Sequence, residues 1–530
     1  MSGRARTKLS ARTRALFWSA HAWVGVLSSV VLFTLFFLGP FALFWKELGP
    51  WQQQLGPPAP APESRHLEIA QREADARLAE HSTRLGIHLP DERVPWIKVE
   101  SSGPDGERVT WVDPSSGERT GQHSDLGYFL FAMHFLDPIP GGKYMAGIAA
   151  AALLFLIATG LVIQLGKLIR ELVQFRPRLR PRALWADAHK VVGILGLPFL
   201  VVFAWSGAIL CLFSSLLLPV FVVGSFDGDV TVVEQAAGWR WPPKPAGEST
   251  AAPDLELVLK RARAALPAVR HKAFVVYNHG DKNAVIDVRG GRDDRLSYHT
   301  NVRTSREGDV QWIHEPDNAT RPSQVSGGLH GLHFASWAGP GIKAVYALLA
   351  LLGAFCILTG NLVWLERRRS RGLGLGDVVL ARLTAGACAG LCVAVAALFM
   401  ANRMLPSNLV DRPSWEHCVF WTAWTIAAAY AGLLPSAARS SRQLLRGAGF
   451  ILCAVPVVHT LQTGQFPLAD QASSHILGVE LGLVALGILL LAAGHAVRKV
   501  QNRTDHSLGS IPKHASPSQA RVPPRAKQSG

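Results

Sequence analysis

Eight apolar runs divide the chain, and each is long enough to cross the roughly 30 Å hydrocarbon core of a bilayer as a helix. The runs are Phe17–Trp45, Tyr144–Leu165, Val191–Val223, Gly341–Leu365, Val378–Met400, Cys418–Leu434, Gly447–Leu461 and Ile476–Ala496. The first run is too long for a signal peptide, and no small-residue cleavage site follows it, which favours an uncleaved anchor. We therefore expect a mainly α-helical membrane protein with eight transmembrane helices. The first four helices span 17–45, 144–165, 191–223 and 341–365, and the other four lie within 366–500.

Basic residues mark alternate loops between these runs. About half of the 54 Lys and Arg residues lie in five short stretches: Arg4–Arg14, Lys167–Lys190, Arg367–Arg382, Arg439–Arg446 and the tail from Arg498. Cytoplasmic loops carry such an excess, so residues 1–16, the loop 166–190 and the tail 501–530 are expected in the cytoplasm. The tail is polar and is expected to be disordered. The net charge of +16 thus indicates a bilayer and not nucleic acid as the partner.

Two long polar segments, 46–143 and 224–340, fall on the outer side, which is the periplasm if the protein lies in a bacterial inner membrane. Each has the pattern of a small α+β module. The expected helices and strands of the two modules are the helix Arg65–Arg84, the strands Val94–Glu100 and Arg108–Asp113, the helix Asp254–Ala265, the strands Ala273–Tyr277 and Ala284–Arg289, and a further strand pair that turns near Ser305–Gly308.

The chain repeats itself, and the repeat contains histidines. His21, Gly25 and Gly39 in the first run have the spacing His-x3-Gly-x13-Gly, and His189, Gly193 and Gly207 repeat it in the third. The repeated unit is a helix, an external module and a second helix.

The second and fourth runs, together with the residues just before them, carry the other half of the repeat. Met133-His134-Phe135 precedes Thr159-Gly160, and Leu332-His333-Phe334 precedes Thr359-Gly360. The two His-to-Gly distances are 26 and 27 residues. The first four helices are therefore expected to form a duplicated bundle.

The repeat places the histidines at two depths. His21 and His189 are expected near the cytoplasmic ends of the first and third helices, and His134 and His333 near the outer ends of the second and fourth. Two histidines at one depth on equivalent helices are what a bis-histidine haem needs. A lone membrane histidine can instead be a hydrogen-bonded interface residue or a proton relay. Four histidines at matched depths favour two haems.

The ordered set of motifs resembles the PepSY-associated transmembrane helix family. The matching elements are Ser19-Ala-His21-Ala-Trp-Val-Gly25, Asp187-Ala-His189-Lys-Val-Val-Gly193, Leu332-His333-Phe334 and Thr359-Gly-Asn-Leu-Val-Trp-Leu-Glu-Arg-Arg368. The external segments resemble PepSY domains, most clearly at the turn Asp113-Pro-Ser-Ser-Gly117-Glu118. The resemblance covers about residues 12–370. It implies iron-regulated inner-membrane proteins with two haems that reduce the Fe(III) of a ferric siderophore in the periplasm. His21, His189, His134 and His333 would then be the haem ligands, and His330 is an alternative outer ligand.

The chain has no dinucleotide fingerprint and no P-loop, so electrons are expected from a membrane quinol or a separate reductase. It has no Cys-x-x-Cys-His motif, so the haems would be non-covalent and b-type.

In the last four helices, Glu480 lies in an apolar run, and His417, His459 and His475 are expected near the outer surface. A third haem, a quinol site or a proton path compete there with interfacial histidines and a helix-pairing carboxylate. Two functions of other classes stay open: a non-redox PepSY-type assembly or regulatory protein, and a proton-coupled transporter.

Overall fold

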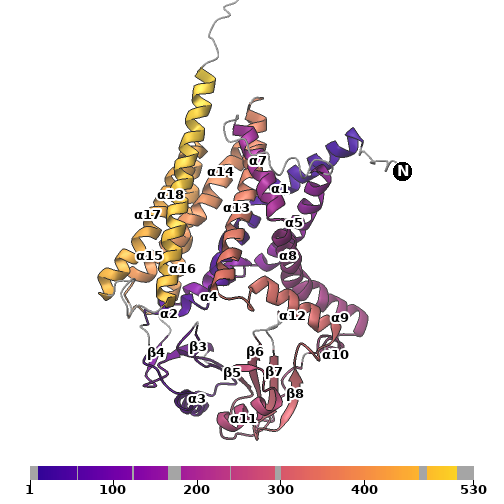
Figure 1. Ribbon diagram of the computed structural model, residues 1–530, viewed down its shortest axis with the longest axis vertical. Helices are drawn as coiled ribbons and strands as arrows, with labels where there is room; N and C mark the ends of the chain where they lie inside the picture. The colour runs from indigo at the N-terminus through magenta and orange to yellow at the C-terminus, as the bar shows by residue number, and fades with distance from the viewer. Residues whose placement is uncertain are drawn as a thin grey trace, which may run out of the picture.

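The structure is a computed structural model. It describes residues 10–509, except 56–57, 93, 105, 122–123, 165–180, 239, 293–295, 297–299, 370, 407 and 465–473. The expected N-terminal segment before residue 10, most of the loop 166–190 and the tail after residue 509 lie outside the described residues. Figure 1 shows a helical region with a sheet domain at one end, which is called the sheet end below. The opposite end carries Arg12, Arg14 and Arg367–Arg369 and is called the basic end.

Seven helical segments of the described chain are long and apolar enough to cross a membrane, which supports a multi-pass protein. Three of them are single helices of the repeat region: α1 (Ala11–Leu43), α5 (Gly142–Gln164) and α13 (Pro340–Arg369). Another, Leu197–Phe226, joins α8 (Leu197–Ala208), the π-helical η1 (Ile209–Leu217) and α9 (Leu218–Phe226), and follows α7 (Pro181–Leu195).

The C-terminal region supplies the other three segments and a further helix. The three are Leu375–Met404, which joins α14 (Leu375–Leu383), η2 (Thr384–Ala389) and α15 (Gly390–Met404), then α17 (Ala437–Thr463), and Ile476–Val497 within α18 (Ser474–Gly509). The remaining expected span falls on α16 (Arg412–Leu433), whose first turns hold Arg412 and Glu416 and which is not among the seven. The count of eight therefore stays a prediction. The expected disordered tail began at residue 501, whereas α18 continues to Gly509.

The two polar segments build one sheet. Its eight antiparallel strands run in the order β4-β3-β2-β1-β5-β6-β7-β8. The first segment gives β1 (Arg84–His88), β2 (Ile97–Gly103), β3 (Gly106–Val112) and β4 (Arg119–Gly121), and the second gives β5 (Arg270–Tyr277), β6 (Val285–Gly291), β7 (Thr300–Ser305) and β8 (Val310–His314). Pairing of β1 with β5, which sets Gly86 opposite Val275, joins the halves. The two expected α+β modules are therefore the two halves of one continuous sheet, because each half offers an open strand edge to the other.

One helix from each half covers the same face of the sheet. α3 (Glu63–Leu78) and α11 (Leu255–Ala265) bury Ile69, Ala74, Val258 and Leu259 against strand residues such as Ile87 and Phe274. Both helices lie on the side of the sheet away from the helical region (Figure 1). The helix expected at Arg65–Arg84 ends six residues earlier, at Leu78, and the chain then turns into β1.

Short helices connect the sheet domain to the membrane helices. They are α2 (Leu48–Gln52), α4 (Leu126–His134), α10 (Thr231–Ala237) and α12 (Arg321–Phe334). α4 precedes α5, and α12 precedes α13. Leu136 (φ 61°) and Ala335 (φ 46°) follow α4 and α12 in the left-handed region, which breaks the helix before the next one begins. His134 and His333 therefore lie on separate short helices and not on the second and fourth membrane helices.

Candidate functional site: two histidine pairs

The fold brings the four predicted histidines together as two pairs. His21 of α1 and His189 of α7 have ring centroids 6.2 Å apart, and they form the basic-end pair. His134 of α4 and His333 of α12 also have ring centroids 6.2 Å apart, and they form the sheet-end pair. Each pair takes one histidine from each half of the repeat. The pairing by depth follows from the fold because the equivalent helices of the two halves bring their histidine rings together.

At the basic end, a neighbouring helix fixes the orientation of each imidazole. His21 Nδ1 lies 3.0 Å from the Thr159 hydroxyl, which itself donates to the Phe155 carbonyl at 2.8 Å. That hydroxyl therefore accepts a hydrogen bond from His21 Nδ1–H. His189 Nδ1–H donates to the Cys356 carbonyl at 2.9 Å. In both rings the proton is on Nδ1, and Nε2 keeps its lone pair.

The sheet-end pair has the same arrangement with other partners. His134 Nδ1–H donates to the Leu35 carbonyl of α1 at 2.8 Å. His333 Nδ1 lies 2.6 Å from the Ser206 hydroxyl, which donates to the Val202 carbonyl at 2.6 Å and therefore accepts from His333. Among the described residues, Nε2 of none of the four histidines has a hydrogen-bond partner. Metal-bound histidines commonly donate their second ring N–H to a carbonyl or similar acceptor in this way.

Glycines lie directly against three of these rings. A Cβ atom added to Gly160 would lie 3.3 Å from His21 Cε1, and one on Gly360 would lie 3.4 Å from His189 Cε1. A Cβ on Gly39 would lie 3.7 Å from His134 Cε1. Each ring thus rests its Nδ1–Cε1 edge on a helix backbone, and Nε2 lies farther from that backbone. This explains the Thr-Gly pairs of the repeat: the threonines lie beside the basic-end histidines and the glycines make room for them.

The residues of both pairs fit a haem iron. With metal–imidazole bonds of about 2 Å, two ligands on opposite sides of one metal place their ring centroids about 6 Å apart. Both observed separations agree with this value. The described residues contain no cluster of three or more His, Cys, Asp or Glu side chains suited to a bare ion. Two neutral imidazoles are the usual protein ligands of a low-spin b-type haem.

Burial also keeps the sheet-end histidines neutral. It lowers the pKa of His134 to about 4 and that of His333 to about 3, because a charged imidazolium loses its hydration there. His330, the alternative outer ligand, stacks its ring on Phe334 with centroids 4.3 Å apart. The geometry therefore favours His333 over His330 as the partner of His134.

With this geometry in place, sequence comparison identifies the family. Residues 18–367 match the family described as the PepSY-associated TM region. The chain belongs to this family. It is also 30% identical over 368 residues to a protein of Pseudomonas aeruginosa that is itself described as uncharacterized, and the match covers 66% of this chain and 89% of that relative. The PepSY-associated region contains all four histidines and both halves of the sheet, whereas α14–α18 lie beyond it.

A cavity of about 950 Å³ opens at the basic end, among the helices that carry His21 and His189 and their neighbour α13. α1, α7 and α13 contribute Arg14, Trp18, Trp23, Arg182, Trp364 and Arg367 to its lining. The Arg367 guanidinium lies 4.3 Å from the centroid of the Trp18 ring. The basic end therefore carries a cavity with a cationic and aromatic lining.

The histidines beyond the PepSY-associated region have other partners. His417 Nε2–H donates to Asp125 Oδ1 at 2.9 Å, and His459 forms a buried pair with Glu480. The side chain of His475 lies outside the described residues. Glu480 is buried, as its apolar run indicates, and its interaction with His459 joins α17 to α18. Sequence reasoning missed Ser206, Leu35 and Cys356 as partners of the histidines. Two of these act through backbone carbonyls, which leave no signal in a sequence.

Proposed function

We propose that this protein holds two non-covalent b-type haems, one on His21 and His189 and the other on His134 and His333, and transfers electrons across the membrane. One observation carries the proposal. In both pairs every imidazole donates its Nδ1–H to a neighbouring helix, and the two rings, whose Nε2 atoms are then available as ligands, have centroids 6.2 Å apart. A bound haem supplies one-electron Fe(III)/Fe(II) chemistry.

The positions of the two histidine pairs support electron transfer along the helical region. His21 lies fourteen residues before Leu35, whose carbonyl holds His134, so the two pairs are about 20 Å apart along α1 at 1.5 Å per residue. This distance spans most of a hydrocarbon core. A donor, either a membrane quinol or a separate reductase, would act at the basic end on the cytoplasmic side, where the arginine-lined cavity lies.

The proposed acceptor is a ferric siderophore or a similar ferric chelate, met at the sheet end on the periplasmic side of a bacterial inner membrane. Support for this acceptor comes from the family resemblance and from the position of the sheet-end pair beside the external domain. Reduction of the chelated iron weakens its binding by oxygen ligands and releases it.

The first test measures the haem content and the absorbance spectrum of the full-length protein purified from haem-replete cells. We expect a red preparation with two haems per chain and the reduced α-band of low-spin b-type haem. The chemically reduced protein should be reoxidised by a ferric hydroxamate chelate and not by the iron-free chelator. A colourless, iron-free preparation would exclude the redox function, and haem without oxidation by any ferric chelate would exclude the proposed acceptor.

A further inference from the structure

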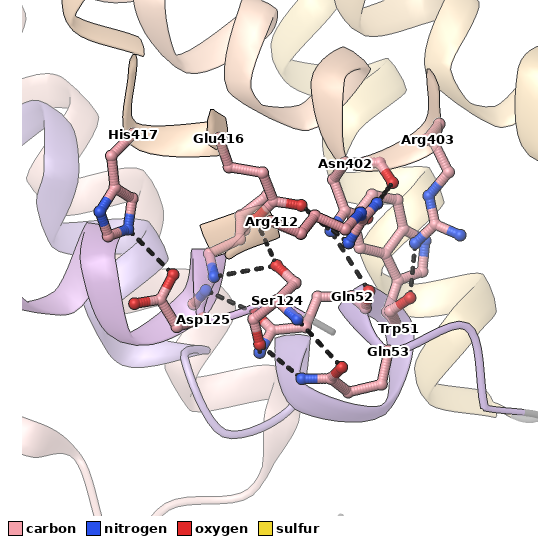
Figure 2. A network of polar contacts seen from close by, with 12 residues as sticks. Trp51, Gln52, Gln53, Ser124, Asp125, Asn402, Arg403, Arg412, Glu416 and His417 are labelled. Carbon is pink, nitrogen blue, oxygen red and sulfur yellow. Dashed lines mark hydrogen bonds and ion pairs between the residues drawn. The ribbon is translucent and has the colours of Figure 1, made fainter. Parts of the chain in front are cut away.

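The start of α4 is enclosed by a buried polar network from the C-terminal region (Figure 2). The Ser124 hydroxyl donates to Glu416 Oε2 at 2.5 Å, and Asn402 Nδ2 donates to Glu416 Oε1 at 3.0 Å. Arg412 forms an ion pair with the same carboxylate at 3.0 Å. Glu416 is 0% and Arg412 2% exposed. The Glu416 carboxylate of α16 therefore binds a residue of its own helix, a residue of α15 and Ser124, which lies two positions before α4.

A second contact involves the next residue of the chain, Asp125, and the first turn of α4. His417 Nε2–H donates to Asp125, the residue that precedes α4, and the His417 ring stacks on Phe129 with centroids 4.0 Å apart. Phe129 also meets the Phe420 ring edge-on at 5.0 Å. Asp125 makes no side-chain cap for α4, so its carboxylate serves the contact with α16. Two successive turns of α16 thus hold one face of α4.

The short helix α2 completes the enclosure. Gln52 accepts from the Gly127 amide at 2.6 Å and donates to the Ser124 carbonyl at 2.9 Å. Asn402 donates to the Gln52 carbonyl at 3.2 Å, and Arg403 donates to the Trp51 carbonyl at 2.5 Å. The backbone at the start of α4 is therefore fixed by side chains whose own positions depend on α15.

Within the described residues, the equivalent helix of the second half has no such enclosure. The N-cap of α12 is Thr320, whose hydroxyl accepts a hydrogen bond from the Ser323 amide and donates to the Ala236 carbonyl. α12 packs against α8 and α10, and Val325 on it is 69% exposed. The polar network therefore distinguishes α4, which carries His134, from α12, which carries His333.

Buried charges are costly, and apolar side chains could have joined the two helical regions at lower cost. A network of directional hydrogen bonds instead allows one arrangement of the helices it joins. α4 has nine residues and ends at His134, so a shift at Ser124 moves the imidazole directly.

We propose that the C-terminal helices act as the positioning element of the sheet-end pair, with Glu416 and His417 fixing α4 and thereby the orientation of His134. This role rests on the proposed haem function. His417 and Glu416 are positioning residues, because they act on the ligand through Ser124, Asp125 and Phe129.

The experiment compares Ser124→Ala and His417→Ala with Tyr430→Phe. Tyr430 lies on the same helix as His417 but bonds Gln443 at 2.8 Å, far from α4, so it is a matched control. Glu416 itself is left in place, because its removal would take the counter-charge from buried Arg412. Two readouts are taken on the full-length protein as purified. One is amide hydrogen exchange in residues 126–134, and the other is the electron paramagnetic resonance spectrum of the oxidised haems.

We expect both test variants to accelerate exchange in α4 on the order of tenfold, as loss of one buried hydrogen bond would. We expect one of the two low-spin signals to shift while the other stays unchanged, and Tyr430→Phe to alter neither readout. Unchanged exchange in α4 would overturn the proposal, and so would faster exchange with both signals unchanged. If the wild-type protein binds no haem while α4 still loosens in the test variants, the anchoring of α4 is supported and the proposed function is refuted.

Discussion

Each histidine pair consists of two imidazoles with the same kind of hydrogen bond, but the helices that carry the two pairs differ. At the basic end, His21 and His189 lie inside α1 and α7, and neighbouring membrane helices hold them through Thr159 and the Cys356 carbonyl. At the sheet end, His134 is the last residue of α4 and His333 the last but one of α12. Both short helices are followed by a left-handed residue.

This difference shows what the duplication has preserved. Each histidine donates its Nδ1–H to a neighbouring helix and has a partner from the other half of the repeat at 6.2 Å, whatever helix carries it. The basic-end pair is carried by α1, a helix of 33 residues, and by α7, which continues towards the membrane-length segment that begins with α8. The sheet-end pair is attached to short helices that connect directly to the sheet domain.

The largest expected effect is the loss of one haem at a time. His21→Ala and His189→Ala should each remove the same haem, and His134→Ala and His333→Ala should each remove the other, because one imidazole alone does not complete a bis-histidine site. The haem content of each purified variant, measured as the pyridine complex, should fall from two to one per chain. Full-length protein in the membrane fraction controls for folding.

His330→Ala is the matched control for this series, because His330 also lies on α12 but stacks on Phe334. It should retain both haems. Loss of a haem in this variant, with retention in His333→Ala, would assign the outer ligand to His330. Retention of both haems in all four ligand variants would place the cofactor elsewhere.

The sequence predicted the histidine pairs better than it predicted their surroundings. A histidine in an apolar run is conspicuous, and the Thr159-Gly160 and Thr359-Gly360 pairs could be matched across the repeat because side chains carry those contacts. The Leu35 and Cys356 carbonyls could not be predicted, since any residue supplies a carbonyl. The role of Glu416 was also missed, because its position near the end of an apolar run resembles that of an ordinary interfacial charge.

The joined sheet shows a further limit of local patterns. β1 has only five residues and begins at Arg84, six positions after the end of α3, and the helical pattern of the sequence runs on to that residue. Its identity as a strand depends on pairing with β2 and with β5, and β5 lies almost two hundred residues away. Local propensity does not contain such a contact, so the pattern indicated two modules where the fold has one sheet.

A smaller effect is expected from the hydrogen-bond partners of the ligands. Thr159→Val removes the acceptor of His21, and Ser206→Ala removes that of His333, so each should weaken its own haem site about 10- to 100-fold. Thr359→Val should have little effect, because its hydroxyl lies 3.4 Å from His189 Nδ1 while the Cys356 carbonyl remains at 2.9 Å. Transfer of haem to an apo-globin acceptor measures all three. Equal losses in the three variants would contradict the assignment of partners.

The smallest effects should come from the glycines and should differ between the two ends. A methyl group at Gly160 would press on His21 from 3.3 Å, whereas one at Gly39 would approach His134 only to 3.7 Å. Overpacking of this kind costs about 1–3 kcal/mol when the surrounding helices cannot move apart. Gly160→Ala should therefore lower the temperature at which haem absorbance is lost, and Gly39→Ala should lower it less. Gly224→Ala is the control, since nothing lies within 4 Å of its added Cβ. If Gly39→Ala proves more damaging than Gly160→Ala, the basic-end pair is not the more tightly packed of the two.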